Sequence, residues 1–320
     1  MIFKPKYMIK VVALIGFCFC FCSCTERTLE LRPEVDPVPI RLYTGIRTRA
    51  LVSAFGETSV GIAYGSRTGE YDGAWDGVAT DNEIRLTPER YYSADGSALF
   101  LRGYYPPAPL EADGSLTYRL TGEEDLMLTG EQSGSLSSPF GPAEEQLLMY
   151  RHLLTRLSFV LTIEAENTEG LRVRELHFNG LAGEVRLSLA TELLTAADET
   201  VSVPIYTAEE GGDGLGFTDG KLSLPGYVLV QPSATFTLDL TLAVDDDRTH
   251  DRVYRELPIR FEGGGTGEGG ISYTVKVELP PPSAPDPVEI SAVATVGEWQ
   301  AGKPGSGELD GGKVSGESLK

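Results

Sequence analysis

The chain has 320 residues, of which 41% are hydrophobic, so it is long and apolar enough to bury the cores of about two domains. Its formal net charge is −20. Because residues 1–49 hold eight of the 27 Lys and Arg but only four of the 47 Asp and Glu, the remainder carries −24. So acidic a surface repels phosphate backbones, which argues against a nucleic-acid partner.

Residues 1–24 have the features of a bacterial export signal. Three lysines precede an apolar run of roughly 12 residues, which suits a signal peptide and is too short for a membrane-spanning helix of about 20 residues. The run ends in Phe21-Cys22-Ser23-Cys24, which resembles a lipobox whose last cysteine, Cys24, would be lipidated. The alternative is an ordinary signal peptide with incidental cysteines.

All four cysteines lie between positions 18 and 24, so the body of the protein contains no thiol. An exported body without disulfides must be stabilised by its hydrophobic core. The same fact excludes a thiol nucleophile, a zinc–cysteine site and an iron–sulfur cluster.

The segment that precedes residue 50 is predicted to be a tether followed by a removable strand. Residues 25–37 contain charges and prolines and are expected to form the tether. The next residues alternate between two faces with the period of a half-buried strand, and the bond Arg49-Ala50 behind them suits a trypsin-like protease. The residues that mark the strand's buried face are Ile40, Leu42, Thr44 and Ile46.

From residue 50 onward, short apolar runs alternate with Gly, Asp, Asn and Pro, a pattern typical of many short strands. The Asp-Gly pairs at 72–73 and 76–77 are interpreted as turns. In the first half, strands are expected over 50–55, 59–64, 83–86, 98–105, 115–119 and 125–128. A loop over 129–142 and a strand over 148–163, with or without a helical lead-in, complete it. In the second half, strands are expected over 172–178, 184–189, 201–205, 221–231, 234–244, 253–261, 271–279 and 288–296.

This pattern predicts an all-β protein with two tandem antiparallel β-sandwich domains, over 50–165 and 166–299. Residues 300–320 are rich in glycine and have few large apolar side chains, so that tail is expected to be disordered.

No arrangement of residues predicts an active site, a metal site or a cofactor, so the protein is not expected to be an enzyme. The three histidines, His152, His177 and His250, are not spaced as a metal pair. The acidic groups Asp245, Asp246, Asp247 and Asp251, and Asp72, Asp76, Asp81 and Glu83, lack the spacing of a calcium loop and are interpreted as solvated turns. The glycine-rich stretch 263–270 has no following helix or closing lysine, and no serine lies in a nucleophile elbow.

Four motifs, taken in order, resemble the fimbrillins, the lipoprotein-derived pilins of Bacteroidales. They extend over nearly the whole body of the chain. The motifs are Ile46-Arg47-Thr48-Arg49-Ala50 with 55–62; 100–106, which ends in Tyr104-Tyr105-Pro106; Asp125-Leu126-Met127 with 150–159; and 270–275 through Val296-Gly297-Glu298-Trp299.

The resemblance implies two transthyretin-like, Greek-key sandwiches and a fimbrial subunit that supports surface adhesion. It implies export as a lipoprotein, held in the outer membrane by lipid on Cys24, and then release into an extracellular fimbrium. An arginine-specific protease would cut at Arg49-Ala50 and remove the first strand. Another fimbrial subunit would then fill the vacated groove with a donor strand.

One departure from the family pattern and one other reading leave alternatives open. Residues 300–320 do not alternate as a donor strand should, so either 288–296 donates, or the subunit ends a fibre, or an uncut form anchors it. The second reading is a surface lipoprotein that does not polymerise and binds glycan or matrix. Its glycan contact would be Trp75, in a platform of Trp75, Tyr91, Tyr92, Tyr104 and Tyr105, although packing is the commoner role for such a ring.

Overall fold

The computed structural model describes residues 36–47, 56–80, 82–164, 166, 168, 170–232, 235–245, 247–281 and 291–297. The predicted signal peptide with Cys24, the bond Arg49-Ala50, the strand expected over 50–55 and the tail over 300–320 lie outside these residues. The all-β prediction is confirmed, since the described elements are strands and a few short 3-10 helices. None of the described helices has the length and apolar character needed to cross a membrane.

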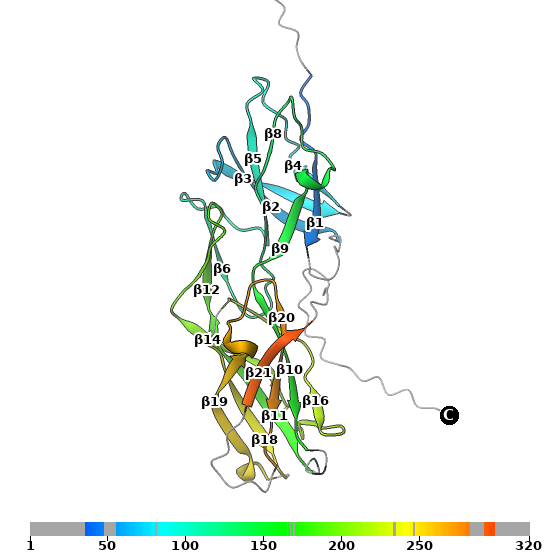
Figure 1. Ribbon diagram of the computed structural model, residues 1–320, viewed down its shortest axis with the longest axis vertical. Coiled ribbons are helices and arrows are strands. Elements are labelled where there is room, and N and C mark those ends of the chain that lie inside the picture. Colours follow the sequence, from blue (N-terminus) through cyan, green and yellow to red (C-terminus); the bar gives the residue numbers. More distant parts are fainter. Residues whose placement is uncertain are drawn as a thin grey trace, which may run out of the picture. The chain divides into compact units, whose positions relative to one another are not determined.

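The strands nearest the N-terminus form a sheet that closes on itself (Figure 1). Their hydrogen-bonded order is β2-β3-β4-β1-β9-β7-β5, and β5 pairs again with β2, while β8 pairs with β5 outside this ring. The strands are β1 (Leu42–Arg47), β2 (Thr58–Gly65), β3 (Gly73–Thr80), β4 (Glu83–Thr87), β5 (Leu99–Tyr105), β7 (Met127–Thr129), β8 (Gln132–Gly134) and β9 (Leu148–His152). Each strand of the ring therefore has a neighbour on both sides.

Closure of the ring depends on a close approach between β2 and β5. Gly61 lies opposite Tyr104 in this antiparallel pair, and a Cβ atom at Gly61 would overlap the Tyr104 ring. The buried tyrosine thus takes the space that a side chain at position 61 would need, and only glycine lets the two strands meet here.

A second, larger sheet has the order β14-β11-β18-β19-β21-β20-β10-β16, with β15 on β11 and β17 on β10. Its strands are β10 (Thr155–Thr162), β11 (Arg172–Ala182), β14 (Thr200–Thr207), β15 (Leu215–Gly216), β16 (Lys221–Ser223), β17 (Val228–Val230), β18 (Thr237–Ala243), β19 (Arg252–Phe261), β20 (Ser272–Glu278) and β21 (Ser291–Gly297). The short 3-10 helices are Glu144–Gln146, Arg248–His250 and Glu262–Gly264.

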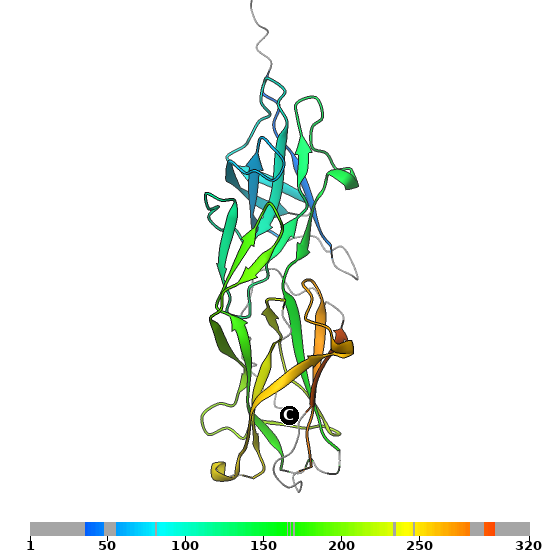
Figure 2. The same cartoon turned by 60° about the vertical axis from the view of Figure 1, so that its left-hand side comes forward.

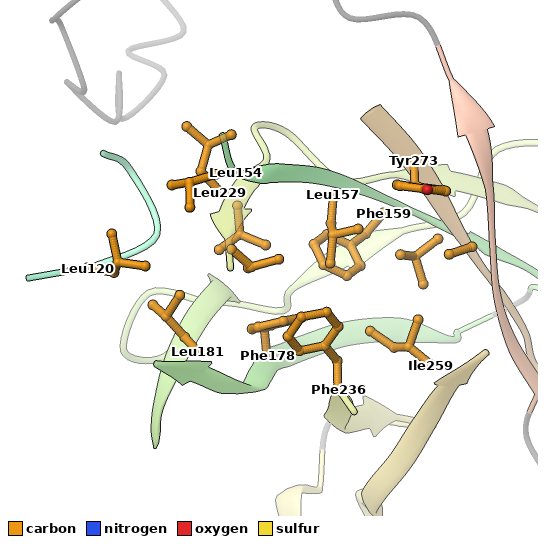
Figure 3. Packing of buried hydrophobic residues seen from close by; sticks show 14 of the residues in the cluster. Leu120, Leu154, Leu157, Phe159, Phe178, Leu181, Leu229, Phe236, Ile259 and Tyr273 are labelled. Carbon is orange, nitrogen blue, oxygen red and sulfur yellow. The ribbon is translucent and has the colours of Figure 1, made fainter. Parts of the chain in front are cut away.

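The core of this sheet contains a row of aromatic rings in contact with one another, part of which is seen in Figure 3. Ring centroids of Phe178 and Phe236 lie 5.0 Å apart, and those of Phe261 and Tyr273 lie 5.0 Å apart in an edge-to-face arrangement. The leucines Leu157 and Leu181 and the ring of Phe178 are each fully buried. Such packing supplies the stability that the thiol-free body cannot take from disulfides.

A small third sheet joins strands from the two halves of the chain. Its order is β13-β12-β6, formed by β6 (Ser115–Arg119), β12 (Glu184–Ser188) and β13 (Leu194–Ala196). β6 precedes the domain boundary predicted near residue 165, and β12 follows it. The larger hydrophobic cluster likewise contains Leu116 and Leu126 together with Leu157 and Phe178. The boundary stays a prediction, and these contacts link the segments on its two sides.

Several strand predictions were wrong. The segment around Trp75 was predicted to be a loop with turns, yet it is strand β3, where Gly77 leaves room for Ile84, whose Cγ2 would lie 2.7 Å from a Cβ at position 77. The loop over 129–142 contains β8. The single strand over 148–163 is two, β9 and β10, separated by the buried Leu153 and Leu154, and its lead-in is one 3-10 turn.

Two further expectations need correction. The strand over 221–231 is divided into β16 and β17 near Gly226, whose φ is +81°. Pairing is not antiparallel throughout, because β1 with β9, β10 with β20, and β19 with β21 are parallel. The sheets are therefore mixed. The two-sandwich arrangement itself stays a prediction.

Candidate functional site

Strand β1 lies between β4 and β9 in the ring and is seen beside β9 in both views (Figures 1 and 2). It runs antiparallel to β4, with Leu42 opposite Ile84, and parallel to β9, from Thr44 opposite Leu148 to Arg47 opposite Arg151. We call residues 38–47 the plug segment and the place that it fills between β4 and β9 the β1 slot.

From Ile40 to Ile46, the plug segment buries the side chains of one face. Ile40 and Ile46 are each 5% exposed, and Leu42 and Thr44 are each 2% exposed, whereas Arg41 between them is exposed. The alternation seen in the sequence therefore corresponds to a buried face and an outer face. The apolar side chains join a cluster with residues of β2, β4, β5 and β9: Val60, Ile62, Ile84, Leu86, Leu101, Leu148 and Tyr150.

Hydrogen bonds hold the plug segment along its length. The amides of Ile40 and Thr44 donate to the carbonyls of Arg90 and Asn82 at 2.7 and 2.8 Å, and the amide of Tyr92 donates back to the carbonyl of Val38 at 3.1 Å. The hydroxyl of Thr44 donates to the carbonyl of Leu148 on β9 at 2.8 Å. Without the segment, the polar groups that face it on both sides of the slot would lose these partners.

Near the slot, a three-residue ion network connects the ring to the β12–β13 turn. Arg102 of β5, whose side chain is 7% exposed, donates to the carbonyl of Leu189 at 2.7 Å and lies 2.9 Å from a carboxylate oxygen of Glu192. Arg151 of β9 lies 2.6 Å from the other oxygen of Glu192. Partial burial alone would raise the pKa of Glu192, but the hydrogen bonds and charges of the two arginines lower it.

The predicted lipidation site and the predicted cleavage site are not among the described residues. Cys24 and the bond Arg49-Ala50 lie outside the described residues, which end at Arg47 and resume at Gly56. Lipidation at Cys24 and cleavage between Arg49 and Ala50 therefore stay predictions.

The aromatic platform suggested for glycan binding is not formed. The ring of Trp75 stacks on Tyr64 with centroids 4.4 Å apart, and the guanidinium of Arg90 lies 5.5 Å from its centroid. Tyr92 and Tyr104 are buried; the Tyr92 hydroxyl accepts from the Phe140 amide, and burial raises the pKa of Tyr104 to about 12. The structure therefore does not bring the five predicted rings together as one exposed surface, although Tyr91 is 46% exposed. A glycan contact at Trp75 itself stays a prediction.

A hollow of about 640 Å³ lies between the start of β3 and the loop that follows β5. Its lining includes Tyr71, Asp76, Tyr104, Pro107 and Glu111, and Trp75 is not part of it. The hydroxyl of Tyr71 donates to Glu131 at 2.8 Å, and the hydroxyl of Tyr104 donates to the Ala108 carbonyl at 3.1 Å. Both tyrosine hydroxyls are thus used within the fold.

Several of the other residues singled out in the sequence have local partners. His152 lies 2.9 Å from Asp125, and His250 lies 2.8 Å from Asp245. Asp251 pairs instead with Arg174, so the two acidic residues of that turn serve different partners. Within the described parts of the chain, no group of three or more potential ligands could hold a metal ion.

The fold is shared with solved structures from Bacteroides and Parabacteroides. A candidate cell adhesion protein from Bacteroides uniformis matches 84% of this chain and 100% of its own, with a TM-score of 0.55 and 14% identity. Candidate cell adhesion proteins from Bacteroides ovatus and Parabacteroides distasonis match 83% and 82% of this chain and 99% and 97% of their own. Their TM-scores are 0.53 and 0.50, at 13% and 10% identity.

No family model matches the sequence, and neither does any curated protein. At sequence identities this low, the structural matches show a common fold and no more than that. At that level, the solved structures agree with the resemblance to fimbrillins drawn from the sequence motifs.

Proposed function

We propose that this chain is a fimbrillin-like subunit of a surface fimbrium that serves adhesion and accepts a strand from another subunit. In this proposal it is exported as a lipoprotein on Cys24, reaches the outer membrane surface, and is cut by an arginine-specific protease at Arg49-Ala50. The plug segment then leaves, and a donor strand enters the β1 slot. The likeness in fold to candidate adhesion proteins supports the role in adhesion.

The observation that carries the proposal is the burial of the plug segment within a closed ring. Its three apolar side chains, Ile40, Leu42 and Ile46, would contribute about 1.5–3 kcal/mol each when buried, or about 5–9 kcal/mol together. Whole domains are stable by only about 5–15 kcal/mol. Loss of the segment would therefore remove a large part of the stability and leave β4 and β9 with open edges.

Strand addition from a neighbour corrects both defects, because it covers the apolar face and pairs the open edges. Donor strand and acceptor slot are different surfaces, so the contact is head-to-tail. Subunits that carry both extend a fibre without nucleotide hydrolysis, and a subunit that only accepts a strand ends it. Cleavage favours exchange over rebinding of the plug segment, because the cut segment is no longer attached to the chain and so is not held at high local concentration near the slot.

The C-terminal strand is engaged within its own sheet. β21 pairs with β20 on one side and with β19 on the other, and Ala292 and Ala294 are buried at 2% and 0% exposure. The candidate donor over 288–296 overlaps this strand and would have to leave both neighbours to donate. This favours a subunit that accepts a strand over one that donates from this position.

The test is limited cleavage of the purified full chain by an arginine-specific protease. The proposal predicts a new N-terminus at Ala50, read by N-terminal sequencing, followed by release of the plug segment and formation of complexes with other fimbrial subunits. A cut at Arg49-Ala50 after which the plug segment is released and the protein, mixed with other fimbrial subunits, stays a stable monomer that binds none of them would contradict it. An uncut chain with lysine at position 49, Arg49→Lys, is the matched control.

A further inference from the structure

The β1 slot is selective for more than apolar character. Three of its four inward positions, those of Ile40, Leu42 and Ile46, are apolar and lie in the hydrophobic cluster of the ring. The fourth, that of Thr44, is just as buried at 2% exposure but polar. The slot thus presents one polar position within an apolar row.

The polar position is defined by a backbone carbonyl. The Thr44 hydroxyl donates to the carbonyl of Leu148 at 2.8 Å, a bond from the side chain that adds to the backbone pairing of β1 with β9. A strand with valine at this point would have the same shape but no donor, and the buried carbonyl would lose that partner.

The position after Thr44 is also restricted. Gly45 lies on the outer face of β1, yet it is buried, whereas Arg41 on the same face is exposed. This buried point of the outer face is thus occupied by a residue without a side chain. The slot therefore suits a strand whose residues at the positions of 40–46 are, in order, apolar, any, apolar, any, Ser or Thr, small and apolar. This strand runs parallel to β9 and antiparallel to β4.

We infer that the occupant of the slot after cleavage is a segment of a different protein that carries this pattern. The inference rests on the proposed function. With Leu, Ile, Val, Met or Phe as the apolar residues and Gly, Ala or Ser as the small one, residues 40–46 are the single match in the 320-residue sequence. Residues 50–320, which remain after the cut, therefore contain no matching segment to give to another copy. The assembly step is heterotypic.

The experiment uses the full chain, nicked after Arg49, so that the plug segment stays bound until it is exchanged. Fluorescent ten-residue peptides with the sequence of residues 38–47 are added, and their incorporation is followed by anisotropy and native mass spectrometry. The set comprises the unchanged peptide and its Thr44→Ser, Thr44→Val, Gly45→Val and Arg41→Ala versions. Because the changes are in the peptide, folding of the protein is the same in every arm.

We expect the unchanged, Thr44→Ser and Arg41→Ala peptides to be incorporated with affinities within about threefold of one another, since each keeps the hydroxyl and the small residue. The Thr44→Val peptide should bind about 10- to 100-fold more weakly because it lacks the donor to the Leu148 carbonyl. Gly45→Val should weaken binding by at least about tenfold.

Each of three outcomes would overturn one of three claims: strand acceptance, the residue pattern of the slot, or heterotypic assembly. If the unchanged peptide is not incorporated, the proposed function fails. If the Thr44→Val and Gly45→Val peptides bind as well as the unchanged one, the slot accepts peptides but the inferred pattern is wrong. If nicked chains that have lost residues 1–49 form homopolymers without any added partner, the heterotypic inference is wrong although strand acceptance stands.

Discussion

Truncation of Leu42 in the intact chain tests how strongly the plug segment is held. Leu42 is 2% exposed and lies opposite Ile84 in the pairing of β1 with β4. The change Leu42→Ala deletes side-chain carbons from the ring's hydrophobic cluster without changing the charge or the backbone. Arg41→Ala, at the exposed neighbouring position, is the matched control.

The expected loss follows from the burial. Each buried methylene contributes about 0.8 kcal/mol, so the three carbons lost account for about 2.4 kcal/mol. The cavity left behind adds to this, and buried Leu→Ala changes cost about 2–5 kcal/mol in all. A free energy of unfolding lower by that amount is therefore expected for Leu42→Ala, whereas Arg41→Ala should change it by less than about 0.5 kcal/mol.

Urea denaturation followed by tryptophan fluorescence measures this difference, and strand exchange in the nicked chain gives a second reading. Each 1.4 kcal/mol lost from the bound plug segment should make its displacement by a fluorescent peptide about tenfold more favourable. A Leu42→Ala protein as stable as the control, with unchanged exchange, would refute the view that β1 is an integral part of the ring.

The other predictions concern the ring and its ion network. Gly61→Ala should lower the free energy of unfolding by about 1–3 kcal/mol or more, and with it the melting temperature, because the added Cβ overlaps the Tyr104 ring at the β2–β5 closure. An unchanged melting curve would contradict this. Glu192→Gln should cost about 1–3 kcal/mol in urea denaturation at pH 7, because the nearly buried Arg102 loses its charged partner. Since the two arginines lower the pKa of Glu192, its stabilising effect is complete above the usual glutamate pKa and is lost as the pH falls through the lowered value. The difference between wild type and Glu192→Gln should therefore shrink below about pH 4, and a constant difference from pH 7 to pH 3 would argue against the ion network.

Much of the fold follows from local alternation in the sequence. The strands over 59–64, 98–105 and 115–119 were predicted close to their observed bounds, because apolar and polar residues alternate there and glycine, proline or acidic residues lie near their ends. The strand over 40–46 was recognised for the same reason. In the structure its four inward side chains are buried, as the alternation indicates.

The misses arise where a distant contact overrides a local signal. The Asp-Gly pairs at 72–73 and 76–77 are strong turn signals, yet Gly77 lies in a strand because Ile84 of β4 takes up the space beside it. The break at Leu153 and Leu154 is invisible in the sequence, since both residues are apolar and both are buried. Its cause is the passage of the chain from one sheet to the other.

Parallel pairing could not be predicted either. The partners of β1, β10 and β19 in parallel ladders lie more than 30 residues away in the sequence, and no local pattern encodes which strands meet. The same limit applies to the site. Alternation identified the inward residues of the plug segment, but the bond from Thr44 to the Leu148 carbonyl, which makes the slot selective, depends on β9 and is known only from the structure.

Hydrogen exchange of the backbone amides before and after cleavage tests the central claim most directly. If β1 is a removable plug, amides of β4 and β9 around Ile84 and Leu148–Arg151 should exchange slowly in the intact chain, and much faster once residues 1–49 are released. Amides of β18, which belongs to the second sheet and not to the ring, should keep their protection and serve as the internal control. Equal protection of β4 and β9 before and after release would contradict the account.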